Sequence, residues 1–199
     1  MRKVDPVKHE EKRRKILEAA AQCFGRSGFQ GASISHICVE AGMSAGHLYH
    51  YFPSKEAIVK AMFDANLERA ANRFGETSKG ESVLDALTAH VERSAPDDGR
   101  NTPLLFDMFA EAGRNPTMAK ILGEHSYRMQ LLLVDLLSRG QERGEVDPSL
   151  DPEVVAPVLI SLVDGSKTLA LRNPHLAALS YSEVFRTLIS RFLSPPASK

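Results

Sequence analysis

One stretch of the chain, from Ser33 to Lys55, constrains the fold more than any other, because two short helical patterns follow each other across a glycine turn. Ser33 is a residue type that caps helices, and apolar residues follow it at the spacing i, i+3, i+4, i+7. Gly42 ends this first pattern, since glycine enters the left-handed conformation of a tight helix exit without strain. Ser44 is placed to cap the second pattern. The spacing predicts a helix–turn–helix, whose second helix enters the major groove of DNA.

An aromatic and cationic cluster follows this unit and makes the indication more specific. The segment Leu48-Tyr49-His50-Tyr51-Phe52 ends the second pattern, and Lys55 stands near the start of the next helix. Tyrosine hydroxyls and a lysine ammonium donate hydrogen bonds to phosphates. The cluster therefore favours contacts with a nucleic-acid backbone.

Composition excludes several other classes of protein. The chain has 199 residues, of which 43% are hydrophobic, enough for a sizeable core. No apolar run approaches the roughly 20 residues of a membrane span, and the polar N-terminus lacks the apolar stretch of a secretory signal. The two cysteines, Cys23 and Cys38, fall on apolar helix faces, which favours free thiols over a disulfide or a metal site. We therefore expect a cytoplasmic protein.

Charge is distributed unevenly although the whole chain is neutral, with 25 basic and 25 acidic residues. Residues 1–60 contain ten lysines and arginines against six aspartates and glutamates, so the remainder is acidic. A basic part joined to an acidic part suits DNA binding at one end only. The basic run from Lys12 to Lys15 is either a solvated helix face or a phosphate clamp, and the neighbouring helix–turn–helix favours the clamp.

The rest of the sequence keeps a helical pattern, and we expect an all-α fold. Residues 1–7 suggest a disordered arm, and a first helix is expected from Lys8 to Ser27. Another is expected from Lys55 to about Arg73. Later helices begin where a proline occupies the first helical position, at Pro103, Pro116 and Pro152.

A set of positions spread over residues 28–58 carries a family resemblance. It comprises Gly28-Phe29, Ala32-Ser33-Ile34, Ile37, Ala41-Gly42-Met43-Ser44, Gly46, Leu48-Tyr49, Tyr51-Phe52 and Lys55-Glu56. This set resembles the DNA-binding domain of the TetR family of bacterial regulators. Cys38 departs from the family pattern, which usually has alanine, and we expect a small buried thiol there with no change of role. The resemblance implies a three-helix DNA-binding domain, placed at residues 1–54, and a helical ligand-binding and dimerisation domain at residues 55–199.

The segment from Val154 to Leu171 differs from the other helical patterns, because its apolar residues surround nearly the whole helix. A helix that is apolar on every side must be buried on every side. In a domain this small, one side is then expected to meet a second chain, together with the helix from Ser182 to Leu193. The resemblance implies the same homodimer. The alternative is a central helix of a monomer, and Pro157 is expected to kink the helix or delay its start.

The exposed face of the second short helix is expected to carry the DNA contacts. The resemblance and the helix geometry both point to Ser33, Ser44, Ala45, Gly46, His47, Tyr49, His50, Tyr51 and Lys55. Ala45 can touch a thymine methyl group, and Gly46 allows close backbone approach. His47 and His50 can bond base edges or phosphates, although two surface histidines or a metal pair are alternatives. The tyrosines, Lys55 and Ser33 are expected at phosphates.

A small-molecule site is expected in the C-terminal part, on weaker grounds. The candidate residues are Met62, Phe106, Phe109, Met118, Leu122, His125 and Met129. Methionines and aromatics pack adaptably around apolar ligands, but such residues more often form a plain core than line a pocket. His125 is polar within an apolar stripe, and a core histidine bonded to a backbone carbonyl is the alternative. Asp164 needs a partner, for which Lys167 or a residue across the dimer is available.

Together these patterns predict a DNA-binding transcriptional regulator, most simply a repressor that a small-molecule effector of unknown identity releases from double-stranded operator DNA. The alternatives are a DNA-binding dimer without an effector and, with less support, an all-α enzyme. An enzyme needs a nucleophile with its base or a metal triad, and the sequence shows no HExxH, GxSxG or P-loop motif. We therefore expect no catalysis, no cofactor, no metal and no membrane partner.

Overall fold

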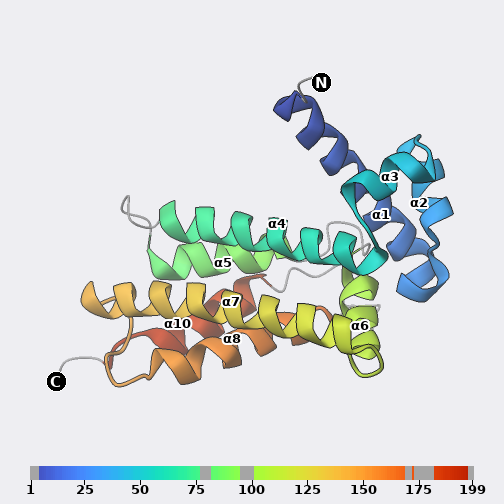
Figure 1. The fold of residues 1–199 in the computed structure, drawn as a ribbon. Helices are drawn as coiled ribbons and strands as arrows, with labels where there is room; N and C mark the ends of the chain where they lie inside the picture. The colour runs from blue at the N-terminus through green and yellow to red at the C-terminus, as the bar shows by residue number, and fades with distance from the viewer. Residues whose placement is uncertain (1–4, 77–81, 95–100, 169–171, 173–181, 197–199) are drawn as a thin grey trace. The chain divides into compact units, whose positions relative to one another are not determined.

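The computed structural model of the chain is built from helices, and it describes residues 5–76, 82–94, 101–168, 172 and 182–196 (Figure 1). The helices are α1 (Pro6–Gly31), α2 (Ile34–Ala41), α3 (Ala45–Tyr51), α4 (Lys55–Glu76), α5 (Val83–Ser94), α6 (Asn101–Ala112), α7 (Pro116–Glu142), α8 (Pro152–Ser166) and α10 (Ser182–Leu193). No strand occurs among these described residues. The predicted all-α class is confirmed.

The chain divides into two compact units. The first unit comprises Met1–Ala65 and Asp98–Glu124, and the second comprises Asn66–Asp97 and His125–Lys199. Helices α4 and α7 contribute residues to both units. The units are thus divided differently from the domains placed at residues 1–54 and 55–199.

The first unit has one core, which is supplied by α1, α2, α3, the first half of α4, α6 and the start of α7. Leu48 and Phe52 of the helix–turn–helix are buried in it, and so are Met108 of α6 and Met118 of α7. Cys23 and Cys38 are both free, and burial raises the pKa of the Cys38 thiol. The expected small buried thiol at position 38 is confirmed.

Helix α1 begins earlier than the sequence pattern predicted. Asp5 caps it, because its Oδ1 accepts the backbone N–H groups of Val7 at 3.1 Å and Lys8 at 3.5 Å, and Pro6 follows at the first helical position. The prediction of an arm up to residue 7 was therefore wrong at its C-terminal end. The predicted exit is present, since the helical path breaks at Gly28, which has φ 69° and ψ 171°.

The helix–turn–helix has the caps that the sequence predicted. The Ser33 hydroxyl accepts the N–H of His36 at 3.1 Å, and the Ser44 hydroxyl accepts the N–H of His47 at 3.3 Å. Gly42 adopts the left-handed conformation with φ 64° and ψ 44° and ends α2. These local hydrogen bonds satisfy backbone groups that helix ends leave open, so they fix where α2 and α3 begin and end.

The second unit buries a core shared by the second half of α4 with α5, α7, α8 and α10. Asp151 caps α8 by accepting the N–H of Glu153 at 3.0 Å, and α8 continues through Pro157. Pro157 therefore does not delay the start of the helix. Helix α8 ends at Ser166. Residues 169–171 lie outside the described residues, and so does Ser180, whose residue type is suited to cap a helix that begins near Ser182. No helix in the described ranges is long and apolar enough to span a membrane.

Candidate nucleic-acid interface

Helix α3 is a short helix with one buried side chain and a polar outer face. Its seven residues bury Leu48, whereas Ala45, Gly46, Tyr49 and His50 are exposed and His47 is half-buried. A methyl group added at Gly46 would meet no atom within 4 Å, so the surface above this residue is open. The predicted base-reading side chains therefore share the solvent-facing side of one helix.

The two capping serines have a defined structural role beside their predicted one. Ser33 forms a capping box with His36, since His36 Nδ1 also accepts the backbone N–H of Ser33 at 3.4 Å. Both hydroxyls hold helix N-termini, where backbone N–H groups favour anions. Contact of these serines with phosphates stays a prediction.

Tyr51, the last residue of α3, lies among three imidazole rings. The ring centroid of His9 is 4.7 Å from that of Tyr51, and those of His47 and His50 are each 5.5 Å away. His9 comes from α1 and is not among the residues that the sequence indicated. His9 lies four residues before Arg13, so the two side chains share one face of α1, and this spacing is the sequence signal that could have indicated His9.

The Lys55 side chain makes hydrogen bonds within the protein. Its ammonium donates to the backbone carbonyls of Phe29 at 2.7 Å and Ala32 at 2.9 Å, and Nζ stands 4.5 Å from the centroid of the Phe29 ring. An ammonium has three donors, so two of them hold the connection between α1 and α2. The predicted phosphate contact of Lys55 is not tested by this arrangement.

The basic run on α1 divides into exposed and packed cations. Lys12, Arg14 and Lys15 are exposed, and Arg14 pairs with Glu18 at 3.5 Å. Arg13 instead places its Cζ 5.4 Å from the centroid of the Phe52 ring and lies 3.9 Å from the carboxylate of Glu10. The run is therefore not a uniform solvated face.

The residues predicted to bind a small molecule are divided between the two units. Met118 is fully buried in the core of the first unit, and Met129 is buried in the core of the second. The first unit also holds Met62, Phe106, Phe109 and Leu122, whereas the second holds His125. Phe109 is exposed, and Met62, Phe106, Leu122 and His125 are half-buried. Lys167 is the partner of Asp164, as the sequence indicated, at 2.9 Å.

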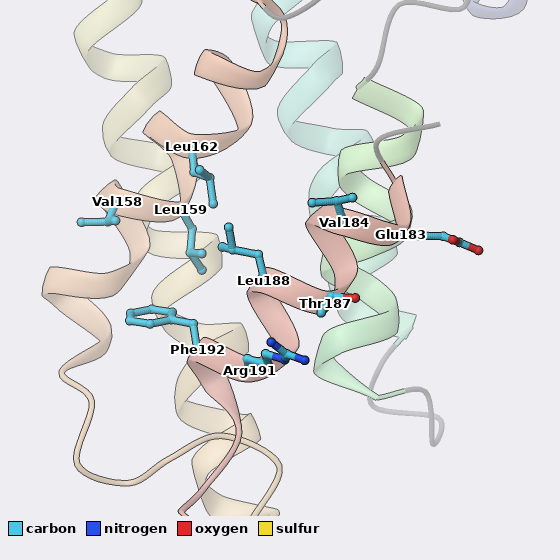
Figure 2. A pocket seen from close by; sticks show the side chains of 9 residues that line it. All are labelled: Val158, Leu159, Leu162, Glu183, Val184, Thr187, Leu188, Arg191 and Phe192. Carbon is cyan, nitrogen blue, oxygen red and sulfur yellow. The ribbon is translucent and has the colours of Figure 1, made fainter. Parts of the chain in front are cut away.

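An open apolar groove lies on the second unit between α8 and α10. Figure 2 shows its lining side chains, which include Val158, Leu159 and Leu162 from α8 and Val184, Leu188 and Phe192 from α10. Leu159 is buried, but the others are exposed or half-exposed, and Val154 extends the exposed row along α8. Both helices thus bury one apolar side in their own unit and present another to solvent.

Comparison with known proteins identifies the family. Residues 16–62 match the model of the bacterial regulatory proteins of the tetR family, and residues 83–194 match that of the BetI-type transcriptional repressor C-terminal domain. The chain is 30% identical over 182 residues to the HTH-type transcriptional regulator UidR of Escherichia coli strain K12, spanning 92% of this chain and 93% of that one.

Solved structures give the same result. The fold matches that of Salmonella enterica GusR with a TM-score of 0.77 and 31% identity, covering 92% of this chain and 95% of that one. A TetR-family regulator from Rhodococcus sp. shares the fold with a TM-score of 0.80 at 23% identity, covering 93% of this chain and 100% of that one. The chain belongs to the TetR family of bacterial regulatory proteins and is a transcriptional regulator.

Proposed function

We propose that this regulator is a homodimeric repressor, which reads operator DNA with α3 and is released from it by a small molecule bound in the C-terminal helical part. The observation that carries the proposal is the outer face of α3, where exposed Tyr49 and His50 stand beside an open backbone at Gly46. A helix that buries one residue and is capped at its N-terminus, next to the capped helix α2, is suited to enter a major groove.

The proposed dimer interface consists of the segments Val154–Leu171 and Ser182–Leu193. Its support is the groove between α8 and α10, which exposed valines, a leucine and a phenylalanine line together with the polar Glu183, Thr187 and Arg191. Such surfaces on a water-soluble unit mark contacts with another chain. A two-fold pairing would bury α8 and α10 of both protomers against each other. A monomer with α8 at its centre does not fit the exposure of Val154 and Val158.

Pairing gives DNA binding its geometry. In a dimer of this kind, two copies of α3 face successive major grooves about 34–36 Å apart. Ser44, Ala45, Gly46, His47, Tyr49 and His50 would then lie on the face that meets base edges. Ser33, Tyr51 and Lys55 would lie at the phosphates, where they fix register rather than sequence, and the Tyr49 hydroxyl can reach either group.

Release by an effector follows as a shift between two arrangements of the dimer. A molecule that binds one arrangement more tightly than the other changes the population of the DNA-competent one. The candidate effector residues are Met62, Phe106, Phe109, Met118 and Leu122 in the first unit and His125 and Met129 in the second, and α4 would transmit the change. The test uses molecules that are found to stabilise the protein, each at a saturating concentration. If operator binding stays unaltered with every one of them, the result supports the alternative, a dimer without an effector.

Alanine substitutions at His47 and Tyr49 test the DNA-reading role. A duplex is first selected by the wild-type protein from a random pool, and affinities are then measured by fluorescence anisotropy. Each variant should lose about 1–3 kcal/mol of binding free energy per base-reading contact removed. Tyr127→Ala on α7 is the matched control, because Tyr127 is 61% exposed and Tyr49 is 51% exposed. Wild-type affinity in the His47→Ala, Tyr49→Ala double variant would refute the assignment.

A further inference from the structure

Two side chains of α1, one helical turn apart, reach the end of the DNA-reading helix. The imidazole of His9 packs on Tyr51, with ring centroids 4.7 Å apart and planes inclined by 37°. The guanidinium of Arg13 lies over the ring of Phe52, 5.4 Å from its centroid. Tyr51 is the last residue of α3, and Phe52 is its C-cap. The first turns of α1 thus contact α3 at its C-terminal end.

Helix α3 depends on such contacts for its orientation. It has seven residues and buries Leu48 alone, so neither its length nor its core contact is large. Helices this short are stabilised by tertiary packing rather than by their own hydrogen bonds. The Ser44 cap holds its N-terminal end, and the rings around Tyr51 lie at the other end.

The position of His9 is itself well defined. Asp5 caps α1 through its side chain, and the backbone N–H of His9 donates to the carbonyl of Asp5 at 3.0 Å. His9 is half-buried, whereas Val7, Lys8 and Glu10 around it are exposed. The backbone that carries the His9 imidazole is therefore held in the capped first turn of α1.

Tyr51 connects His9 to the residues proposed to read bases. His47 packs on the Tyr51 ring at 5.5 Å, and His50 meets it edge-on at 5.5 Å with an interplanar angle of 88°. A displacement of the Tyr51 ring would therefore change the packing of both histidines. His9 is placed to influence readout without itself lying on α3.

We propose that His9 is a positioning residue for DNA recognition: packed on Tyr51, it fixes the orientation in which α3 presents His47 and His50 to the bases. This inference rests on the proposed function of α3. It differs from a phosphate contact by His9, since a phosphate contact would strengthen binding to every sequence alike.

The test compares a duplex selected by the wild-type protein with a shuffled duplex of equal length and composition, over a series of KCl concentrations. His9→Ala should weaken binding to the selected duplex about threefold to tenfold and lower the ratio of selected to shuffled affinity. The slope of log affinity against log salt should stay unchanged, because no cation at the phosphates is removed. His9→Phe, which keeps an aromatic ring, should restore the ratio. Val7→Ala is the control, because Val7 is an exposed residue of the same helical turn, and this variant should bind as wild type does.

Three results would overturn the inference. An equal loss on both duplexes with a shallower salt slope would make His9 a phosphate contact. Unchanged binding of His9→Ala, or a His9→Phe variant as weak as His9→Ala, would remove the role of the ring. Thermal unfolding of each variant is recorded in parallel, and the His9→Ala midpoint should match that of Val7→Ala. A wild-type protein that selects no duplex would contradict the proposed function itself.

Discussion

At the scale of single residues, His90 on α5 makes stability sensitive to acid. Its Nδ1 lies 2.7 Å from Nη2 of Arg73, and because a guanidinium only donates, Nδ1 is the acceptor and the imidazole is neutral. Burial, followed by the charges of Arg73 and Lys167, lowers the pKa of His90 from 6.5 to about 4. Protonation of the folded protein at this site would break the contact and place three cations together.

The pH dependence of unfolding should show this directly. Between pH 6.5 and about pH 4, the unfolded chain carries a proton on His90 that the folded chain does not. The contribution of neutral His90 to the free energy of unfolding is therefore fully present above pH 6.5 and is lost as the pH falls towards 4, by about 3 kcal/mol in total.

Urea unfolding at a series of pH values measures this loss of stability. His90→Gln should flatten the curve in this window, whereas His50→Gln, at an exposed site, should leave it as in wild type. Parallel curves for wild type and His90→Gln would contradict the assignment.

At the scale of elements, the junction between α1 and α2 is held by α6. Oδ2 of Asp107 accepts the N–H of Phe29 at 2.8 Å, and the Gln30 amide donates to Glu111 Oε1 at 2.8 Å. The hydrogen bond from Gln30 is also the largest cause of the lowered pKa of Glu111. Gly28 makes the approach possible, because a Cβ there would lie 2.6 Å from Asp107 Oδ2.

Gly28→Ala should therefore destabilise the protein for two reasons. Alanine disfavours the φ of 69°, and its methyl group would displace the Asp107 carboxylate. We expect a loss of about 1–3 kcal/mol, measured by urea unfolding. Gly46→Ala is the glycine control, since its methyl group would meet nothing within 4 Å and α3 is helical there. Its stability should stay level or rise. Equal stability of both variants would contradict the account.

The same junction shows what the sequence could and could not predict. The caps Ser33 and Ser44 and the exit at Gly42 were predictable, because each is decided by residues within one helical turn. The Asp5 cap is a local signal of the same kind, because Asp5 directly precedes a proline at the first helical position, and it marks the true start of α1. The partners of Lys55 and Asp107 are different, since they lie 23 to 78 residues away and no periodicity encodes them. Tertiary hydrogen bonds of this kind cannot be predicted from local sequence patterns.

At the scale of the whole molecule, the groove between α8 and α10 predicts the state of assembly. Leu188→Glu places a charge on the exposed apolar side of α10, where it should separate dimers into folded monomers at micromolar concentration. Operator affinity should fall at least about tenfold, because two linked half-site contacts become independent. Light scattering coupled to size-exclusion chromatography measures the mass.

The matched control for this experiment is Leu131→Glu on α7. Leu131 is 44% exposed and Leu188 is 48% exposed, so the two substitutions add a charge at similarly exposed positions, but Leu131 lies outside the groove. Leu131→Glu should remain dimeric. A dimeric Leu188→Glu protein with wild-type operator affinity would rule out this interface.

The core of the first unit also limits how the regulator can be engineered. Met108 and Met118 are fully buried in the core cluster that also holds the buried side chains of α1, α2 and α3, although they come from the region after residue 100. A fragment cut after residue 54 would expose these contacts to water and lose Ile58 and Val59 as well. A chimera that joins this DNA-binding unit to the ligand-binding domain of another protein must therefore include α6 and the first turns of α7.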